Sequence, residues 1–154
     1  MSGNWAVAPA RDADLADWLA LRDQLWEGDP PEAHLQEIRD SRATGRFGAW
    51  LARDSEGRAL GFAEATLRDF ADGVPVGRPI AYLEGILVIE PARRRGIARA
   101  LLAAVTDWAR AAGADHMASD AVLDNADSHA WHAAMGFDEV DRVVTYARSL
   151  APAG

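Results

Sequence analysis

The segment YLEGILV, residues 82–88, places one glutamate inside an otherwise apolar run. A carboxylate that is buried without a partner costs free energy, so Glu84 needs either a cation beside it or a chemical role. One interpretation is a structural ion pair with an arginine. The other is that Glu84 serves as a general base, which accepts a proton directly or through water.

A basic turn with a glycine follows this run. RRRGIA, residues 93–98, comes after Pro91 and opens a predicted helix. The first N–H groups of a helix lack intrahelical partners, the helix dipole adds partial positive charge, and Gly96 allows a ligand to approach the backbone. The turn therefore predicts an anion site that fits a pyrophosphate, with a solvated arginine cluster as the alternative. It is neither a Walker A loop nor a dinucleotide fingerprint, because both require glycine patterns that are missing here.

A later segment, NADSHAWHAAMGF, predicts a helix with one polar face. Asn125, Ser128 and His132 follow at intervals of three and four residues, which brings them to the same side of a helix. An imidazole can donate a proton, so His132 is a candidate general acid. The alternative is a histidine that is packed and hydrogen-bonded for structural reasons.

The composition excludes several classes of function. None of the 154 residues is cysteine, which removes disulfides, thiolate metal sites and a covalent thioester intermediate, and we expect no metal. The net charge of -8 disfavours nucleic-acid binding and attracts a polycationic partner. No apolar run approaches the roughly 20 residues of a membrane span, and the start of the sequence lacks a signal-peptide pattern. We therefore expect a cytoplasmic protein.

Hydrophobic periodicity predicts the elements that position these residues. Strands are expected at residues 4–9, 47–53, 60–68, 80–89, 116–119 and 137–147. Helices are expected after Asp12 or Asp14, after Asp29, at 95–113 and at 125–135, with these aspartates as candidate N-caps of the first two. The order β-α-α-β-β-β-α-β-α-β predicts a single α+β domain over residues 1–154, an α/β sandwich around a mixed sheet.

Together, the basic turn and the polar helix resemble two motifs of the GNAT superfamily of acetyl-CoA-dependent N-acetyltransferases. The pyrophosphate loop of that superfamily, Arg/Gln-x-x-Gly-x-Gly/Ala, is matched by Arg93, Gly96 and Ala98. Its later cofactor helix is matched by Asn125, Ser128, Gly136 and Phe137, with His132 at the position where tyrosine is common. The resemblance implies a mixed, mostly antiparallel central sheet flanked by about four helices.

This resemblance also implies the co-substrate and its contacts. Acetyl-CoA would donate its acetyl group to an amine by direct attack, without a covalent enzyme intermediate. The backbone of Leu87 and Val88 would align the pantetheine arm and stabilise the oxyanion. The expected cofactor contacts are Leu87, Val88, Arg93, Arg94, Arg95, Gly96, Ile97, Ala98, Asn125, Ser128 and His132.

A closer resemblance is to the aminoglycoside 6'-N-acetyltransferases of the chromosomal Acinetobacter-type group. It rests on DWLALRDQLW (17–26), HLQEIRD (34–40), YLEGILV (82–88), SDAVLDN (119–125) and SHAWHAAMGF (128–137). The resemblance implies an aminoglycoside as the acceptor, a role in antibiotic resistance and a homodimer. Glu84 would then remove a proton from the ammonium group of the acceptor before the amine attacks.

An aminoglycoside is a rigid polyamine, so its pocket should supply carboxylates and an aromatic wall. The expected acceptor contacts are Trp26, Glu27, Tyr82, Glu84, Asp120 and Asp124. Other interpretations stay open, since Trp26 can be a core residue, Glu27 and Asp29 solvated charges, and Asp124 a helix N-cap. The alternatives for the whole protein are acetylation of another polyamine, an amino sugar or a protein N-terminus, and non-catalytic acyl-CoA binding.

Overall fold

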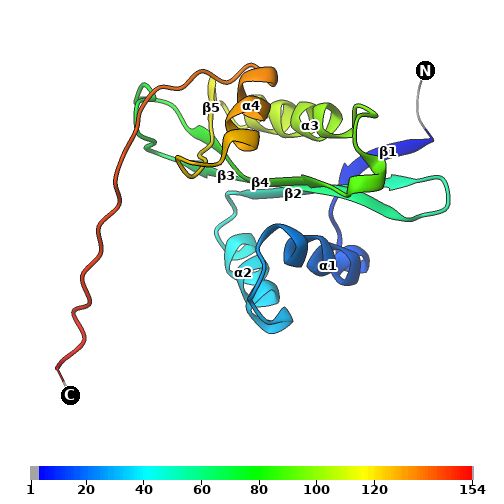
Figure 1. Cartoon of the computed structure of the whole chain (residues 1–154), viewed down its shortest axis with the longest axis horizontal. Helices are drawn as coiled ribbons and strands as arrows, with labels where there is room; N and C mark the ends of the chain where they lie inside the picture. The colour runs from blue at the N-terminus through cyan, green and yellow to red at the C-terminus, as the bar shows by residue number, and fades with distance from the viewer. Residues whose placement is uncertain (1–3, 154) are drawn as a thin grey trace.

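A five-stranded sheet forms the centre of the structure, a computed structural model that describes residues 4–153 (Figure 1). The spatial order of the strands follows the chain: β1 (Trp5–Pro9), β2 (Phe47–Asp54), β3 (Ala59–Arg68), β4 (Ile80–Val88) and β5 (His116–Ala118). Neighbouring strands from β1 to β4 are antiparallel, whereas β4 and β5 are parallel. A parallel pair needs a crossover connection, and a helix supplies it here. The expected mixed, mostly antiparallel sheet is confirmed.

Helices cover both faces of the sheet, which confirms the expected sandwich (Figure 1). One face carries α1 (Leu15–Leu25) and α2 (Pro31–Ala43), and the other carries α3 (Ile97–Ala111) and α4 (Ala126–Ala134). Two 3-10 helices, Asp12–Asp14 and Glu90–Ala92, precede α1 and α3. Every helix within residues 4–153 is too short or too polar to cross a membrane.

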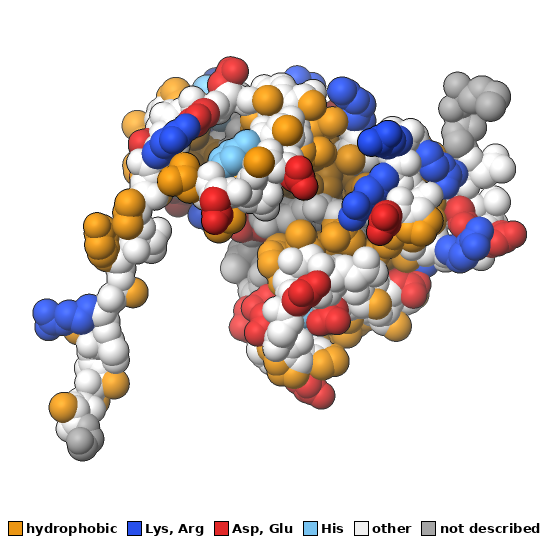
Figure 2. Space-filling view, viewed as in Figure 1, with side chains coloured by type: hydrophobic (Ala, Val, Ile, Leu, Met, Phe, Trp, Pro, Cys, Tyr) orange, Lys and Arg blue, Asp and Glu red, His pale blue; other side chains and the backbone are white. Residues whose placement is uncertain are grey.

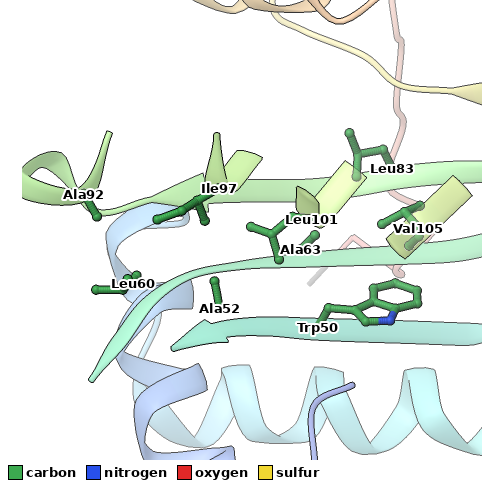
Figure 3. Packing of buried hydrophobic residues seen from close by; sticks show 10 residues of the cluster. Trp50, Ala52, Leu60, Ala63, Leu83, Ala92, Ile97, Leu101 and Val105 are labelled. Atoms are coloured by element: carbon green, nitrogen blue, oxygen red, sulfur yellow. The ribbon is translucent and has the colours of Figure 1, made fainter. Parts of the chain in front are cut away.

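The packing of α3 fixes the start of that helix against the end of β4. Ile97, Leu101 and Val105 recur every four residues and are fully buried, which makes one apolar stripe. Figure 3 shows this stripe over side chains of the sheet, among them Trp50 and Leu83. Burial of each such aliphatic side chain stabilises the fold by roughly 1.5–3 kcal/mol. The basic turn before α3 is therefore attached to a rigid element.

The opposite face has its own cluster, in which Trp18 and Leu21 of α1 and Ile38 of α2 pack on Leu51 and Phe62. All five side chains are nearly inaccessible to solvent. This cluster holds α1 and α2 on the sheet, and so it also fixes the turn between the two helices.

The helix caps differ from those expected. Asp14 holds the N-cap position of α1, as expected, but its side chain makes no hydrogen bond to that helix. Its carboxylate instead accepts hydrogen bonds from the backbone N–H of Arg11 at 2.8 Å and from Arg53 Nη2 at 2.7 Å. Asp12 pairs with Arg42 of α2. For α2, the N-cap position is held by Pro30 and not by Asp29. Asp12 and Asp14 therefore form tertiary ion pairs and give α1 no side-chain cap.

The strand expected at residues 137–147 is wrong. Phe137 still packs against Trp131 of α4, and the Val140 backbone lies against Gly73. The chain then runs away from the body as an extended segment, and no strand of residues 4–153 pairs with it (Figure 1). The segment carries exposed apolar side chains, which are Val140, Val143, Val144, Tyr146 and Leu150. An alternating sequence becomes a strand only when it pairs with the edge of a sheet. Within residues 4–153 this segment pairs with no sheet edge.

Candidate active site

Glu84 occupies an irregular position in β4. Leu83 pairs with Ala65 and Gly85 pairs with Glu64, so Glu84 is the extra residue between two successive pairs of the β3–β4 ladder. A bulge of this kind bends the strand and re-aims a side chain. The bulge therefore directs the Glu84 carboxylate independently of the regular alternation of β4.

The carboxylate of Glu84 has two partners on β3. Thr66 Oγ1 donates to it at 2.6 Å, and Arg68 Nη2 donates to its two oxygens at 2.7 and 3.0 Å. The ion pair considered from the sequence therefore exists, with Arg68 as the cation. However, the Glu84 side chain is 27% exposed, so the carboxylate is held in place and still accessible.

Arg68 links this carboxylate to a second acidic group. The Arg68 guanidinium carbon lies 3.5 Å from the centroid of the Tyr82 ring, and the Tyr82 hydroxyl donates a hydrogen bond to Asp120. Burial, followed by the hydrogen bond and charge of Asp120, raises the pKa of Tyr82, so its hydroxyl stays a neutral donor. Arg68 thus contacts Glu84 and Tyr82, and Tyr82 extends this cluster to Asp120.

His132 is held at both ring nitrogens. Nδ1 lies 2.7 Å from the backbone oxygen of Ser128, which can only accept, so we place the hydrogen of the neutral ring on Nδ1. Nε2 then accepts from the hydroxyl of Ser119 at 2.9 Å. The same Ser119 oxygen is 3.4 Å from the backbone oxygen of Leu83, the residue before Glu84. A neutral His132 has no proton to give at Nε2, so it acts as an acid only when cationic and through Ser119.

Asn125 begins α4 as its N-cap. Its side chain accepts a hydrogen bond from the backbone N–H of Ser128 at 3.1 Å. The alternative assignment of Asp124 as the N-cap is therefore wrong, and Asp124 is an exposed loop residue. The amide NH2 group of Asn125 is not used by the cap, so its expected contact with the co-substrate stays a prediction.

The turn before α3 has the backbone of an anion site. Gly96, at the N-cap of α3, has φ +83°, and Arg94 has φ +62°, a strained value for a residue with a side chain. Figure 2 shows basic side chains gathered where β4 leads into α3. Arg93 also donates to the backbone oxygen of Val88 at 3.0 Å. Ile97 is buried in the core, so it can meet a ligand only through its backbone N–H.

An open edge of β4 lies between this turn and Glu84. The ladder between β4 and β5 comprises the pairs Ile80–His116, Ala81–Met117 and Tyr82–Ala118, and it stops there within the described chain. Leu87 and Val88 lie on the section of β4 beyond the ladder. An extended pantetheine arm fits such an edge, since no strand of the described chain pairs with it there. The Val88 carbonyl already accepts from Arg93, so the arm would pair with the other backbone groups of this section.

Trp26 follows α1 and packs on β4. Its ring meets Phe62 edge to face at 6.0 Å between centroids. It also covers Gly85, where an added Cβ would come within 2.5 Å of Trp26 Cζ2. The residue is only partly buried, so part of Trp26 is packed on β3 and β4 and part of it is accessible to a ligand. Glu27 and Asp29 are exposed on the turn that follows, and their contact with an acceptor stays a prediction.

Sequence reasoning missed Arg68 and Ser119. The signal for Arg68 was present, because Glu64, Thr66 and Arg68 alternate along one face of β3. Which β4 residue they meet depends on the register and on the bulge. Ser119 lay within the quoted segment SDAVLDN, but its neighbour His132 is thirteen residues away.

Comparisons with known proteins agree with this geometry. Residues 13–137 match the acetyltransferase (GNAT) family. An aminoglycoside N(6')-acetyltransferase type 1 from Serratia marcescens is 44% identical over 138 residues, 89% of this chain and 94% of the relative. A protein of the same name from Acinetobacter baumannii is 39% identical, over 94% of this chain and 98% of the relative.

Two solved structures extend the comparison. The crystal structure of AAC(6')-Ih from Acinetobacter baumannii has a TM-score of 0.89 and 38% identity, over 96% of this chain and 99% of that one. AAC(6')-Iy in complex with the bisubstrate analogue CoA-S-monomethyl-acetylneamine has a TM-score of 0.88 and 35% identity, over 94% of this chain and 98% of that one. The chain therefore belongs to the acetyltransferase (GNAT) family, and within it to the aminoglycoside N(6')-acetyltransferases.

Proposed function

We propose that the protein transfers the acetyl group of acetyl-CoA to the 6'-amine of an aminoglycoside and thereby confers resistance. The names of its relatives and the bisubstrate analogue held by a similar structure support this activity. The observation in this chain that carries it is the group of Tyr82, Glu84 and Asp120 beside the open edge of β4. Carboxylates and an aromatic wall suit a polyamine.

Glu84 is the proposed base of the reaction. The acceptor amine is an ammonium group at neutral pH, and it must lose one proton before its nitrogen can attack the thioester carbonyl. The Glu84 carboxylate is paired with Arg68 in the structure. A bound polycation would compete with Arg68 for that carboxylate. The ammonium group of the acceptor would then lie beside the carboxylate that accepts its proton.

The remaining steps use backbone groups and the chain from His132 to Ser119. Formation of the N–C bond puts negative charge on the carbonyl oxygen, which the N–H groups of Leu87 or Val88 would stabilise. Rupture of the C–S bond then releases a thiolate. Its proton comes from water or from the Ser119 hydroxyl, which a cationic His132 re-protonates through Nε2.

Steady-state kinetics with an aminoglycoside and with an analogue that lacks its 6'-amine test the proposal. We expect release of CoA thiol with tobramycin or kanamycin, an acetyl group on the 6'-nitrogen by NMR, and loss of turnover with the analogue. Equal turnover of both compounds would contradict the assigned position. Binding of acetyl-CoA without turnover on any amine of a panel would instead indicate a binding domain.

We further infer that residues 1–154 form one domain, which acts as a cytoplasmic homodimer. Support for the dimer comes from exposed apolar side chains on the C-terminal segment and on the loop after β5, where Val122 and Leu123 are 68% and 69% exposed. Exposed apolar side chains that gather on one surface are characteristic of an interface. In a homodimer, a second copy of this chain would cover these side chains. Light scattering should give twice the chain mass of 16.6 kDa.

A further inference from the structure

A buried ion pair lies beneath the proposed acceptor site. Arg22 of α1 and Glu64 of β3 are in direct contact, and each side chain is only 4% exposed. Trp18 Nε1 donates to the same carboxylate at 2.9 Å. Burial raises the pKa of Glu64 and the charge of Arg22 opposes that rise, so the carboxylate depends on Arg22 to stay ionised.

Every nitrogen of the Arg22 side chain has a partner. Nη1 donates to Glu64 on the sheet, Nη2 donates to Glu37 of α2, and Nε donates to Nδ1 of His34, also of α2, at 3.4 Å. A planar guanidinium bound at three nitrogens cannot rotate. Arg22 therefore fixes the orientation of its own plane relative to α1, α2 and β3 together.

The fixed plane lies against Trp26. The Arg22 guanidinium carbon is 4.7 Å from the centroid of the Trp26 ring, within the range of a cation–π contact. The same ring covers Gly85, the neighbour of Glu84 in β4. One chain of contacts thus runs from the buried carboxylate, through Arg22 and Trp26, to the strand that carries the proposed base.

We propose that Arg22 is a positioning residue for acceptor binding, which holds the Trp26 ring in place on β4 as a wall of the acceptor pocket. This role rests on the proposed function, since it assumes that the exposed side of Trp26 meets the acceptor. Stability alone does not explain the ion pair, because well-packed apolar residues often replace buried ion pairs without loss. An apolar pair would fill the space but would lack the planar cation that orients Trp26.

The test is a paired apolar replacement, Arg22→Met with Glu64→Leu, which leaves no buried charge unpaired. We expect the KM for tobramycin to rise about tenfold through loss of the cation–π contact. The KM for acetyl-CoA should stay within about twofold, because its expected contacts lie on β4, α3 and α4. An unchanged tobramycin KM in this folded variant overturns the proposal.

A matched control separates positioning from general stability. Arg53 of β2 and Asp14, which directly precedes α1, form another ion pair at the opposite end of that helix from Trp26, with side chains 28% and 10% exposed. Arg53→Met with Asp14→Asn should lower thermal stability without changing the tobramycin KM. An equal rise of KM in both double variants would show a purely structural role and overturn the proposal.

A third comparison uses Trp26 itself. Trp26→Ala should raise the tobramycin KM, and adding the Arg22 and Glu64 replacements to it should raise the KM no further, since they act through the same ring. A normal KM for Trp26→Ala overturns both the positioning role and the acceptor wall, whereas acetylation of the 6'-amine by that variant leaves the proposed function standing. If the apolar pair does not fold, Arg22→Lys serves instead, because it keeps the charge but loses the planar face. A wild-type KM for Arg22→Lys likewise overturns the proposal.

Discussion

At the scale of single residues, the Glu84 carboxylate is bound by Thr66 and Arg68, and its side chain is still 27% exposed, so the carboxylate is both held in place and accessible to a ligand. We predict that Glu84→Gln lowers kcat/KM for an aminoglycoside by about 10²- to 10³-fold, because an amide cannot accept the proton. The variant should fold normally, since glutamine still accepts from Thr66. The pH profile of kcat/KM checks this, and wild-type rates at every pH would contradict it.

His132 and Ser119 give a second residue-level prediction, because their hydrogen bond makes them one unit. If a cationic His132 delivers its proton through Ser119, either Ser119→Ala or His132→Gln interrupts the same path. We expect each to lower kcat by up to about 10²-fold, and the double variant to lose no more than the stronger single variant. Single-turnover kinetics measures this step directly. Losses that add in the double variant would show that the two groups act separately.

A site residue could be predicted from the sequence when its local pattern alone demands a role, and it could not when its contacts depend on how strands pair. Glu84 was predictable because one carboxylate in an apolar strand already demands a partner. Arg68 was not, because its contact with Glu84 depends on the register of two strands and on a bulge, both of which arise only in the folded sheet. The choice between Asp124 and Asn125 as the N-cap likewise depended on the exact start of α4, because a shift of one residue changes which side chain is the cap.

At the scale of elements, the periodic helices and strands were predicted within a few residues, since each buries a regular apolar pattern. The hydrogen bonds of the N-cap side chains were not, because tertiary partners compete for the same carboxylates. Asp14 is the clear case. Burial pushes its pKa up, but the hydrogen bonds from Arg11 and Arg53 outweigh that effect, so the pKa of Asp14 lies below its usual value. Asp14 therefore anchors α1 to β2 as an anion.

A stability prediction follows for this anchor. A lowered folded-state pKa contributes stability that is present above the unfolded pKa of about 3.9 and lost as the pH falls through the folded value. Asp14→Asn should therefore lower the free energy of unfolding by about 1–2 kcal/mol at pH 7, and the difference should vanish in acid. Urea unfolding at several pH values measures it. Asp12→Asn is the control, and it should have little effect because the Asp12 side chain is 85% exposed. If Asp14→Asn lowered the free energy of unfolding by the same amount at every pH, that result would contradict the anchor.

At the scale of the whole molecule, the segment after Phe137 has a strand-like apolar pattern that the contacts within one chain do not explain. Residues 137–147 alternate as a strand does, but no strand of the described chain pairs with them, and Val144 and Tyr146 are 75% and 89% exposed. Burial of such side chains in an interface stabilises association by roughly 1.5–3 kcal/mol each. Val144→Arg with Tyr146→Arg should therefore convert the proposed dimer to a species with the mass of one chain at micromolar concentration, as measured by light scattering.

Ser149→Arg adds the same kind of charge to the same segment without removing apolar surface, and it should leave the dimer intact. Dissociation by both variants would mean that added charge alone breaks the assembly, and a dimer that survives both would place the interface elsewhere.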